Sequence, residues 1–244
     1  MQDWVRRQLI ERQRPLRCSA VMFQRWLHLL FLHWPVEPET IQRTLPASLE
    51  VETFADKGWI GVVPFFMRGV RPAGLPGVVG VSNFLELNLR TYVRDRLGRP
   101  GIWFYSLDAN QPLAVWFARI CFALPYQHAT MCANVQDGEI VYSSRRTGSA
   151  ETLQYRYYPS MELEEAGFGS LDFFLLERYR LFTQRGGNLM TGRVYHEPYR
   201  LGKVMVRKLD TRLFKLDGLE MPSGSPAHAA YVHRVDVTVY PIGH

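Results

Sequence analysis

The stretch FLELNLRTYV, residues 84–93, decides the fold because its polar and apolar residues alternate almost without interruption. Successive side chains of a β-strand point to opposite faces, so the alternation predicts a strand. Its faces carry Leu85, Leu87, Leu89, Thr91 and Val93 on one side, and Glu86, Asn88, Arg90 and Tyr92 on the other. In a half-buried sheet the polar face contacts water, whereas in a closed barrel it can line a ligand cavity. Both alternatives are open from the sequence.

The composition of the 244-residue chain is that of a folded globular protein, with 47% hydrophobic, 13% aromatic and 21% charged residues. A chain of this length buries enough apolar surface to fold without disulfides or structural metals. No internal repeat, low-complexity segment or linker divides it. We therefore expect a single domain over 1–244, in which 1–15 forms an N-terminal helical arm.

The cysteine content indicates the cellular compartment, and the distribution of charge indicates the class of binding partner. Cys18, Cys121 and Cys132 have no C-x-x-C spacing, which favours a reducing, cytoplasmic setting. The net charge of +6 is spread along the chain, so it suits anionic small molecules better than nucleic acid. The most apolar run, 26–34, is half the length of a membrane span, and we expect no membrane partner.

The remaining pattern is dominated by strands. Further strands are predicted at 26–34, 58–67, 102–109, 128–136, 139–146, 151–158, 178–183, 188–196 and 230–242. Helices are predicted at 111–122 and after Ser170, and a glycine- and proline-rich loop at 69–80, which is either a lid or a surface excursion. Without a βαβ rhythm, these elements predict a mainly β (α+β) fold with a mostly antiparallel sheet curled into a barrel.

Two short-range features of this pattern have structural consequences. The turn at 95–101 predicts that strands 84–93 and 102–109 pair as an antiparallel hairpin. The helix at 111–122 has an apolar stripe, which predicts that this side of the helix packs on the sheet. The stripe consists of Leu113, Trp116, Phe117 and Ile120. Leu85, Leu87 and Leu89 are expected to pack beneath this helix.

Common catalytic motifs are missing from the sequence. It has no G-x-S-x-G elbow, no phosphate-binding P-loop, no H-E-x-x-H pair and no G-x-G-x-x-G after a strand. The seven histidines are scattered without metal-ligand spacing within one element. A histidine on an apolar strand, such as His28 or His33, is more often a hydrogen-bonded core residue than a ligand. We therefore predict no metal and no cofactor.

Several motifs, in this order, carry a resemblance to a known family. They are HWPV (33–36), GWIGVVPFFM (58–67), FLELNLRTYV (84–93), PGIWFYSLDA (100–109) and ARICFALPYQHATM (118–131). Together they resemble the uncharacterised YqjF-like family of the acetoacetate decarboxylase-like superfamily, from about residue 20 to the last strand. The resemblance implies a closed antiparallel β-barrel or cone, with a few helices packed outside and a ligand cavity within.

The same resemblance argues against one activity. In acetoacetate decarboxylases, a helix leads into a Gly-x-Pro-Lys-Lys segment that supplies the Schiff-base lysine, whereas here Pro125 is followed by Tyr126 and Gln127. The lysines of this chain lie elsewhere, at Lys57, Lys203, Lys208 and Lys215. Without an amine at this position no imine can form there, so the resemblance does not imply acetoacetate decarboxylation.

The candidate site combines three neighbouring segments. We predict Glu86, Tyr126 and Asp108 as catalytic residues, with a carboxylate as base and the tyrosine as acid or hydrogen-bond donor. The predicted substrate-binding residues are Asn88, Arg90, Tyr92, Phe104, Ser106, Arg119 and His128. Arg90 is the expected anchor for a carboxylate or enolate.

Three functional interpretations fit these residues. The first is a small-molecule-binding barrel that acts as an enzyme on a carbonyl or carboxylate compound without a Schiff base. The second is a non-catalytic ligand-binding or interaction protein on the same scaffold, and the third is a barrel filled by its own side chains. The expected ligand is anionic or carbonyl-containing, and assembly into a homo-oligomer is left open.

Overall fold

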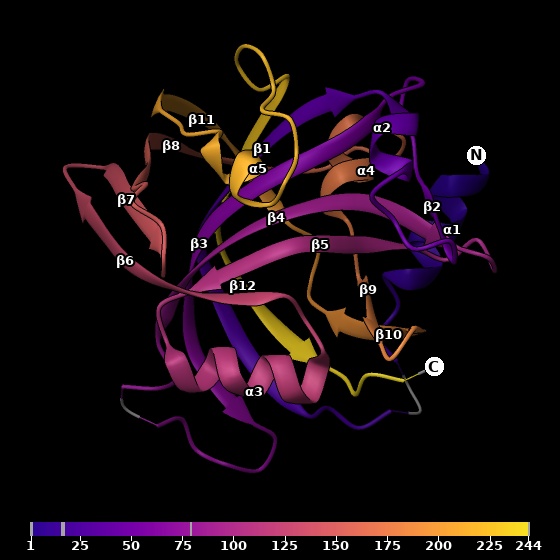
Figure 1. The fold of residues 1–244 in the computed structure, drawn as a ribbon, viewed down its shortest axis with the longest axis horizontal. Helices are drawn as coiled ribbons and strands as arrows, with labels where there is room; N and C mark the ends of the chain where they lie inside the picture. The colour runs from indigo at the N-terminus through magenta and orange to yellow at the C-terminus, as the bar shows by residue number, and fades with distance from the viewer. Residues whose placement is uncertain (1, 16–17, 79, 244) are drawn as a thin grey trace.

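The computed structural model describes residues 2–15, 18–78 and 80–243, and β-strands make up most of its regular structure (Figure 1). The strands in these residues are β1 (Met22–Val36), β2 (Leu49–Val51), β3 (Gly58–Pro72), β4 (Phe84–Asp95), β5 (Pro100–Ala109), β6 (Tyr126–Gln136), β7 (Glu139–Arg146), β8 (Leu153–Glu165), β9 (Arg180–Arg185), β10 (Asn188–Tyr195), β11 (Arg200–Lys208) and β12 (His228–Val239). The helices are α1 (Asp3–Glu11), α2 (Pro38–Gln42), α3 (Pro112–Phe122), α4 (Leu171–Leu176) and α5 (Arg212–Leu216). Met1 of the expected arm and Val79 of the expected loop lie outside the described residues.

All twelve strands belong to one sheet. Their order is β10-β9-β5-β6-β7-β8-β11-β12-β1-β3-β4-β2, with additional pairings of β10 with β12 and of β5 with β4. The expected antiparallel character holds for most pairs, but β5 pairs in parallel with both β6 and β9. For β5 and β6 the reason is the connection through α3, because a crossover helix returns the chain in the same direction. The prediction of a mainly β fold is confirmed.

Most predicted elements are present at the predicted places. Strands β4 and β5 pair antiparallel over Glu86–Arg94, which confirms the predicted hairpin. Ser170 caps α4 by accepting a hydrogen bond from the Phe173 amide, as predicted. The expected loop begins later than predicted, at residue 73, because the end of β3 pairs with the start of β1. Strands β2 and β11 and helix α5 were not predicted.

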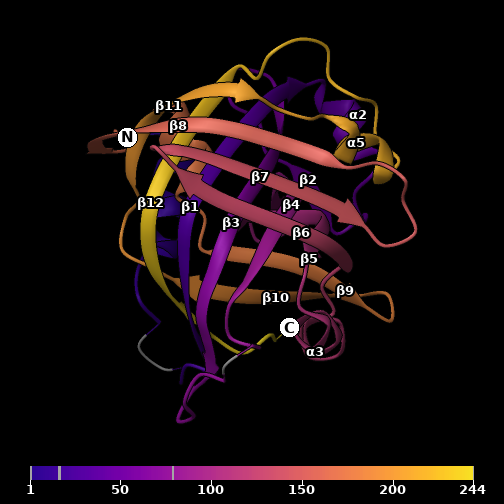
Figure 2. The same cartoon turned by 90° about the vertical axis from the view of Figure 1, so that its left-hand side faces the viewer.

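Strand β4 lies between two hydrophobic layers, so almost all of its residues are buried. On one side, Leu85, Leu87 and Leu89 pack with apolar residues of β1, β3, β6, β7, β8 and α5. Figure 2 shows β6, β7 and β8 in front of β1, β3 and β4. The expectation that these leucines pack beneath 111–122 is wrong, because the pleat directs them to the face opposite α3.

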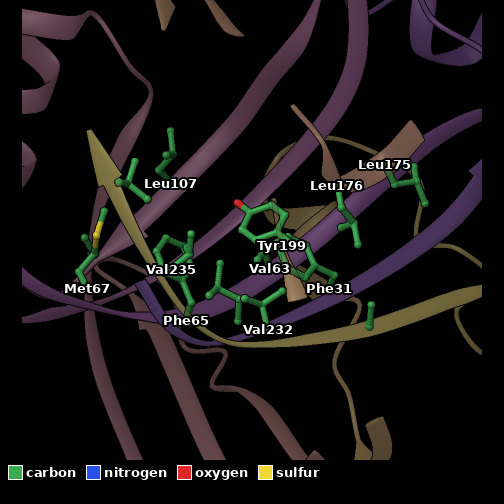
Figure 3. Packing of buried hydrophobic residues seen from close by; sticks show 14 of the residues in the cluster. Phe31, Val63, Phe65, Met67, Leu107, Leu175, Leu176, Tyr199, Val232 and Val235 are labelled. Atoms are coloured by element: carbon green, nitrogen blue, oxygen red, sulfur yellow. The ribbon is translucent and has the colours of Figure 1, made fainter. Parts of the chain in front are cut away.

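The second layer is built from the alternate residues of the same strands. Phe31, Val63 and Phe65 belong to it, together with Leu176 of α4, Tyr199, and Val232 of β12 (Figure 3). Leu30, Leu32 and Val62 belong to the other layer. The alternation along β1 and β3 therefore supplies two cores, as the period of two in a strand requires.

Helix α3 is oriented differently from the sequence-based expectation. Leu113, Trp116, Phe117 and Ile120 are exposed, and Trp116 retains 62% of its accessible surface. The buried residues of the helix are Val115 and Ala118. The sequence carries two apolar stripes, and the stripe of smaller side chains packs on the sheet. Trp116 is therefore not a core residue.

This orientation of α3 predicts how two aromatic residues contribute to stability. Trp116→Ala should change the free energy of unfolding by less than about 1 kcal/mol, because most of the indole is in water already. Phe174→Ala, at a side chain that is 1% exposed, should cost about 3–5 kcal/mol. Urea denaturation of both variants measures these values. A large loss for Trp116→Ala would mean that the stripe is buried after all.

Candidate functional site

A cavity of about 440 Å³ lies on the inner side of the sheet, against β4. Its polar lining includes Glu86, Asn88 and Arg90, the successive inward residues of the β4 polar face, and it also includes Tyr126. These β4 side chains are less than 10% exposed, so this face is turned to the cavity and not to bulk solvent. Cavities of this size are typical of small-molecule sites, and its volume disagrees with a barrel filled by its own side chains.

Glu86 and Tyr126, which both line the cavity, are joined by a hydrogen bond. The Tyr126 hydroxyl donates a hydrogen bond of 2.7 Å to the Glu86 carboxylate. Burial raises the pKa of Glu86 from 4.5 to about 7, against the opposing effect of hydrogen bonds from Tyr126 and Asn88. Burial and the neighbouring carboxylate raise the pKa of Tyr126 well above 10. Tyr126 therefore remains a proton donor, while Glu86 changes its protonation near neutral pH.

Arg90 is a buried cation without a counter-ion among the described residues. Its side chain forms no ion pair there, and its Nη2 has no hydrogen-bond partner. The guanidinium lies 5.2 Å from the ring centre of Phe31 and 5.7 Å from that of Tyr92, so aromatic faces stabilise it partly. The Oδ1 atom of Asn88 also lacks a partner. Arg90 and Asn88 both line the cavity, and each therefore has a buried polar atom that the described protein groups leave without a partner.

A chain of hydrogen bonds connects Arg90 to Asp172 through Tyr92, His33 and His228. The Arg90 Nε donates to the Tyr92 hydroxyl at 3.3 Å, and this hydroxyl lies 2.6 Å from Nε2 of His33. The Nδ1 atoms of His33 and His228 are 2.8 Å apart, and Nε2 of His228 lies 2.7 Å from Asp172. Arginine only donates and a carboxylate only accepts, so with both histidines neutral the hydrogens of this chain all point from Arg90 towards Asp172.

The two ends of this chain differ in their exposure. Burial, His228 and Arg90 hold the pKa of His33 well below its usual value, so His33 is neutral and leaves the charge of Arg90 uncompensated. The Asp172 side chain is 46% exposed and lies at the surface. Gly61 makes room for the chain, since a Cβ there would lie 2.8 Å from His33 Nε2. Tyr92 thus supports Arg90 but is not itself among the cavity-lining residues.

Ser106 and Asp108 lie on the other side of the sheet from the cavity. The pairing of β4 with β5 shifts register at Tyr105, so Leu89 faces Ser106 while Arg90 faces Phe104. This β-bulge inverts the alternation, because one extra residue turns the following side chains over. Phe104 consequently lines the cavity, whereas Asp108 pairs with Arg146 at 2.8 Å. Of the three site residues predicted on β5, only Phe104 lines the cavity, and the prediction that Ser106 and Asp108 belong to the site is wrong.

Arg119 and His128 are also outside the cavity. Arg119 is exposed on α3 and donates from Nε to the Tyr126 carbonyl at 2.6 Å. His128 lies 2.9 Å from the Thr147 hydroxyl. Neither side chain lines the cavity. Arg119 positions the segment after α3 and thereby the backbone of Tyr126.

The sequence-based prediction missed Arg178, which also lines the cavity. It forms a buried ion pair with Glu52, and its guanidinium lies 4.5 Å from the ring centre of Phe174. Its Nη2 has no hydrogen-bond partner. In the sequence, Arg178 is marked only by its place directly after the apolar run of α4. The tertiary structure brings its guanidinium to 5.2 Å from the ring centre of Tyr92.

These contacts define the chemistry available in the cavity. A carboxyl that titrates near pH 7 can accept or donate a proton, and Tyr126 can donate a hydrogen bond beside it. Arg90 can bind a carboxylate or a developing oxyanion. No lysine is among the described residues that line the cavity. Nor does any group of three His, Cys, Asp or Glu in the described part of the chain have the arrangement of a metal site.

The raised pKa of Glu86 predicts a pH-dependent penalty on stability. The unfolded carboxyl ionises near pH 4.5 and the folded one near pH 7, so the folded state loses stability as the pH rises between these values. Glu86→Gln removes this penalty. Its free energy of unfolding relative to the original protein should therefore increase by about 3 kcal/mol from pH 4 to pH 8. Urea titrations across this range measure the difference, and a flat difference would contradict a raised pKa.

Comparisons with known proteins agree with this architecture. The chain shares 35% identity over 223 residues with the uncharacterized protein YqjF of Bacillus subtilis (strain 168), covering 91% of each chain. The enduracididine biosynthesis enzyme MppR complexed with pyruvate has a TM-score of 0.64 and 13% identity, covering 93% of this chain and 91% of that one. An acetoacetate decarboxylase-like enzyme from Sphingomonas wittichii RW1 has a TM-score of 0.60 and 11% identity, covering 92% of each.

The structural likenesses show the fold alone, because the sequence identities are low.

The described residues contain no helix that is long and apolar enough to cross a membrane. The model of DUF2071, an uncharacterized conserved protein family, matches residues 23–236. This match and the 35% identity to YqjF show that the chain belongs to the DUF2071 family of YqjF-like proteins, with an acetoacetate decarboxylase-like fold.

Proposed function

We propose that this protein binds a small carboxylate that also bears a carbonyl group, and that Glu86 and Tyr126 move a proton on the bound molecule. Arg90 anchors the carboxylate, and no Schiff base takes part. The proposed scaffold is a single domain over 1–244 in which the sheet closes into a barrel around the cavity. Two pairings support closure, since β10 joins β12 and β4 joins β5. Three exposed, free cysteines fit the cytoplasmic location that we propose.

The observation that carries this proposal is the unpaired charge of Arg90. Burying a cation without a partner is costly, so buried arginines in proteins are normally matched by an anion. Arg178 has Glu52 and Arg146 has Asp108 and Asp217, whereas Arg90 has no carboxylate within 4 Å among the described residues. Arg90 lines an open cavity, and its buried Nη2 has no hydrogen-bond partner among the described residues. A ligand carboxylate supplies the missing partner.

Glu86 supports the catalytic part of the proposal. With its pKa near 7, it exists in both protonation states at neutral pH, which is the condition for transferring a proton in either direction. A carbonyl next to the reacting carbon would let the resulting charge reside on oxygen. Asn88 can donate a hydrogen bond to that oxygen, and Tyr126, whose single hydrogen goes to the ionised Glu86, can do so once Glu86 is protonated. The structure of MppR complexed with pyruvate supports a 2-oxo acid as the first ligand to test.

The proposed anchor predicts a specific loss of affinity. Arg90→Gln should weaken the binding of 2-oxohexanoate at least about tenfold, because a charge-assisted hydrogen bond contributes roughly 1.5–3 kcal/mol. Arg94→Gln is the matched control on the same strand, at an exposed ion pair with Glu50. Arg90→Lys keeps the charge and should keep part of the affinity. Isothermal titration calorimetry measures all four proteins.

Equal binding of 2-oxohexanoate by Arg90→Gln, or equal binding of uncharged 2-hexanone by the original protein, would contradict the anchor. Thermal unfolding of each variant verifies that it is folded.

The proposed proton transfer separates the enzyme from a binding protein on the same scaffold. In deuterium oxide, the protein should accelerate the exchange of the C3 protons of 2-oxohexanoate, because Glu86 takes one proton and returns a deuteron. Glu86→Gln and Tyr126→Phe should lose at least about 100-fold of this rate, the usual contribution of a general acid or base. Proton NMR follows the exchange. Binding without exchange in the original protein would favour the non-catalytic alternative.

Borohydride is the control for a different route to the same exchange. Treatment with borohydride in the presence of 2-oxohexanoate should leave the protein mass unchanged. A covalent adduct on any lysine would show that an imine forms and would overturn the proposed mechanism.

A further inference from the structure

The cavity is much larger and more apolar than a short keto acid requires. Apart from the polar side chains of β4, most of its inner lining is apolar, including Leu29, Val63, Phe65, Met67 and Leu107. Its 440 Å³ has room for at least about a dozen groups the size of a water molecule. Pyruvate has only six non-hydrogen atoms. A short acid bound at Arg90 would therefore leave most of this apolar surface without contacts.

The mouth of the cavity continues the apolar lining to the surface. Trp116, Phe117 and Leu113 of α3 and Val78 of the loop 73–83 all line the cavity, and all of them are exposed. The Gln111 side chain donates to the Gly80 carbonyl, which ties the start of α3 to this loop. Grouped exposed apolar side chains mark a binding site more often than isolated ones do.

The spacing along β4 shows how far a ligand has to reach. Glu86 and Arg90 are four residues apart, which corresponds to roughly 13 Å along the strand. The loop 73–83 leads into Phe84, and Ala109, which precedes α3, pairs with Glu86, so the mouth lies at the Glu86 end. The long side chains of Glu86 and Arg90 can shorten this distance by leaning towards one another, but a four-carbon acid, whose three carbon–carbon bonds span about 3.8 Å, fills only a small part of the row.

We infer that the ligand is amphipathic: a monocarboxylate whose head binds Arg90 and whose extended hydrocarbon chain passes Glu86 and leaves towards α3 and the loop 73–83. This inference rests on the proposed function and adds the class of substrate to it. The apolar lining contributes affinity for the chain, and the unpaired guanidinium contributes selection for a carboxylate head. The distance of each ligand carbon from the carboxylate head then determines which carbon faces Glu86 and Tyr126.

A series of straight-chain 2-oxo acids with four to ten carbons tests this inference by calorimetry, below the concentration at which they form micelles. Affinity should increase about fourfold for each methylene group that becomes buried. A series that is flat beyond five carbons would overturn the inference. If the affinity is flat but the acids still bind and their binding still depends on Arg90, the proposed function remains valid.

Variants at the mouth test where the chain leaves the cavity. Trp116→Ser should weaken the ten-carbon acid by about fourfold or more and leave the four-carbon acid unchanged. Leu97→Ser is the matched control, because Leu97 is exposed in the turn between β4 and β5 and does not line the cavity. An unchanged affinity of Trp116→Ser for the long acid would overturn the proposed exit. The exit would also be overturned if light scattering showed that Trp116→Ser changes only the molecular mass of the particle, because the exposed side chains of α3 would then belong to a subunit contact.

Discussion

Strand β4 is buried on both faces, and this constraint determines where every polar group of the candidate site can lie. Leu85, Leu87 and Leu89 fill a hydrophobic layer against β6, β7 and β8, so the pleat turns Glu86, Asn88 and Arg90 to the opposite side. That side holds the second hydrophobic layer and cannot accept a charged row without open volume beside it. The cavity is therefore the structural counterpart of the polar alternation in β4.

Spacing along the same strand keeps the two charged groups chemically distinct. If Glu86 and Arg90 were direct neighbours, the guanidinium would lower the pKa of the carboxyl. Arg90 would also form an ion pair with Glu86 and would no longer have an unpaired N–H donor. At four residues apart, burial dominates for Glu86 and raises its pKa to about 7, while Tyr126 supplies the hydrogen bond. Arg90 is oriented instead through Tyr92 and His33, both of which are uncharged. The proposed base and the proposed anion anchor are therefore available in the same cavity.

Tyr126 lines the cavity at the position where the resemblance to acetoacetate decarboxylases would place a lysine. A tyrosine whose pKa is raised well above 10 cannot act as a nucleophile at neutral pH, but it donates a hydrogen bond reliably. Its hydrogen-bond partner Glu86, with a pKa of about 7, is the group that changes protonation near neutral pH. A tyrosine at this position agrees with the proposed function, in which a proton is transferred beside a bound anion without an imine.

Local patterns in the sequence determined the strands, the hairpin of β4 with β5, the Ser170 cap and the alternation that separates Glu86 from Leu87, because each depends on neighbouring residues alone. Only the tertiary structure decided which face of β4 meets the cavity. It also decided that a bulge at Tyr105 removes Ser106 and Asp108 from the cavity, since a one-residue insertion in a pairing leaves no mark in the alternation itself. The orientation of α3 depended on which of two apolar stripes fitted the sheet. Arg178 and the chain from His33 to Asp172 join segments far apart in sequence, and such contacts arise only when the sheet brings them together.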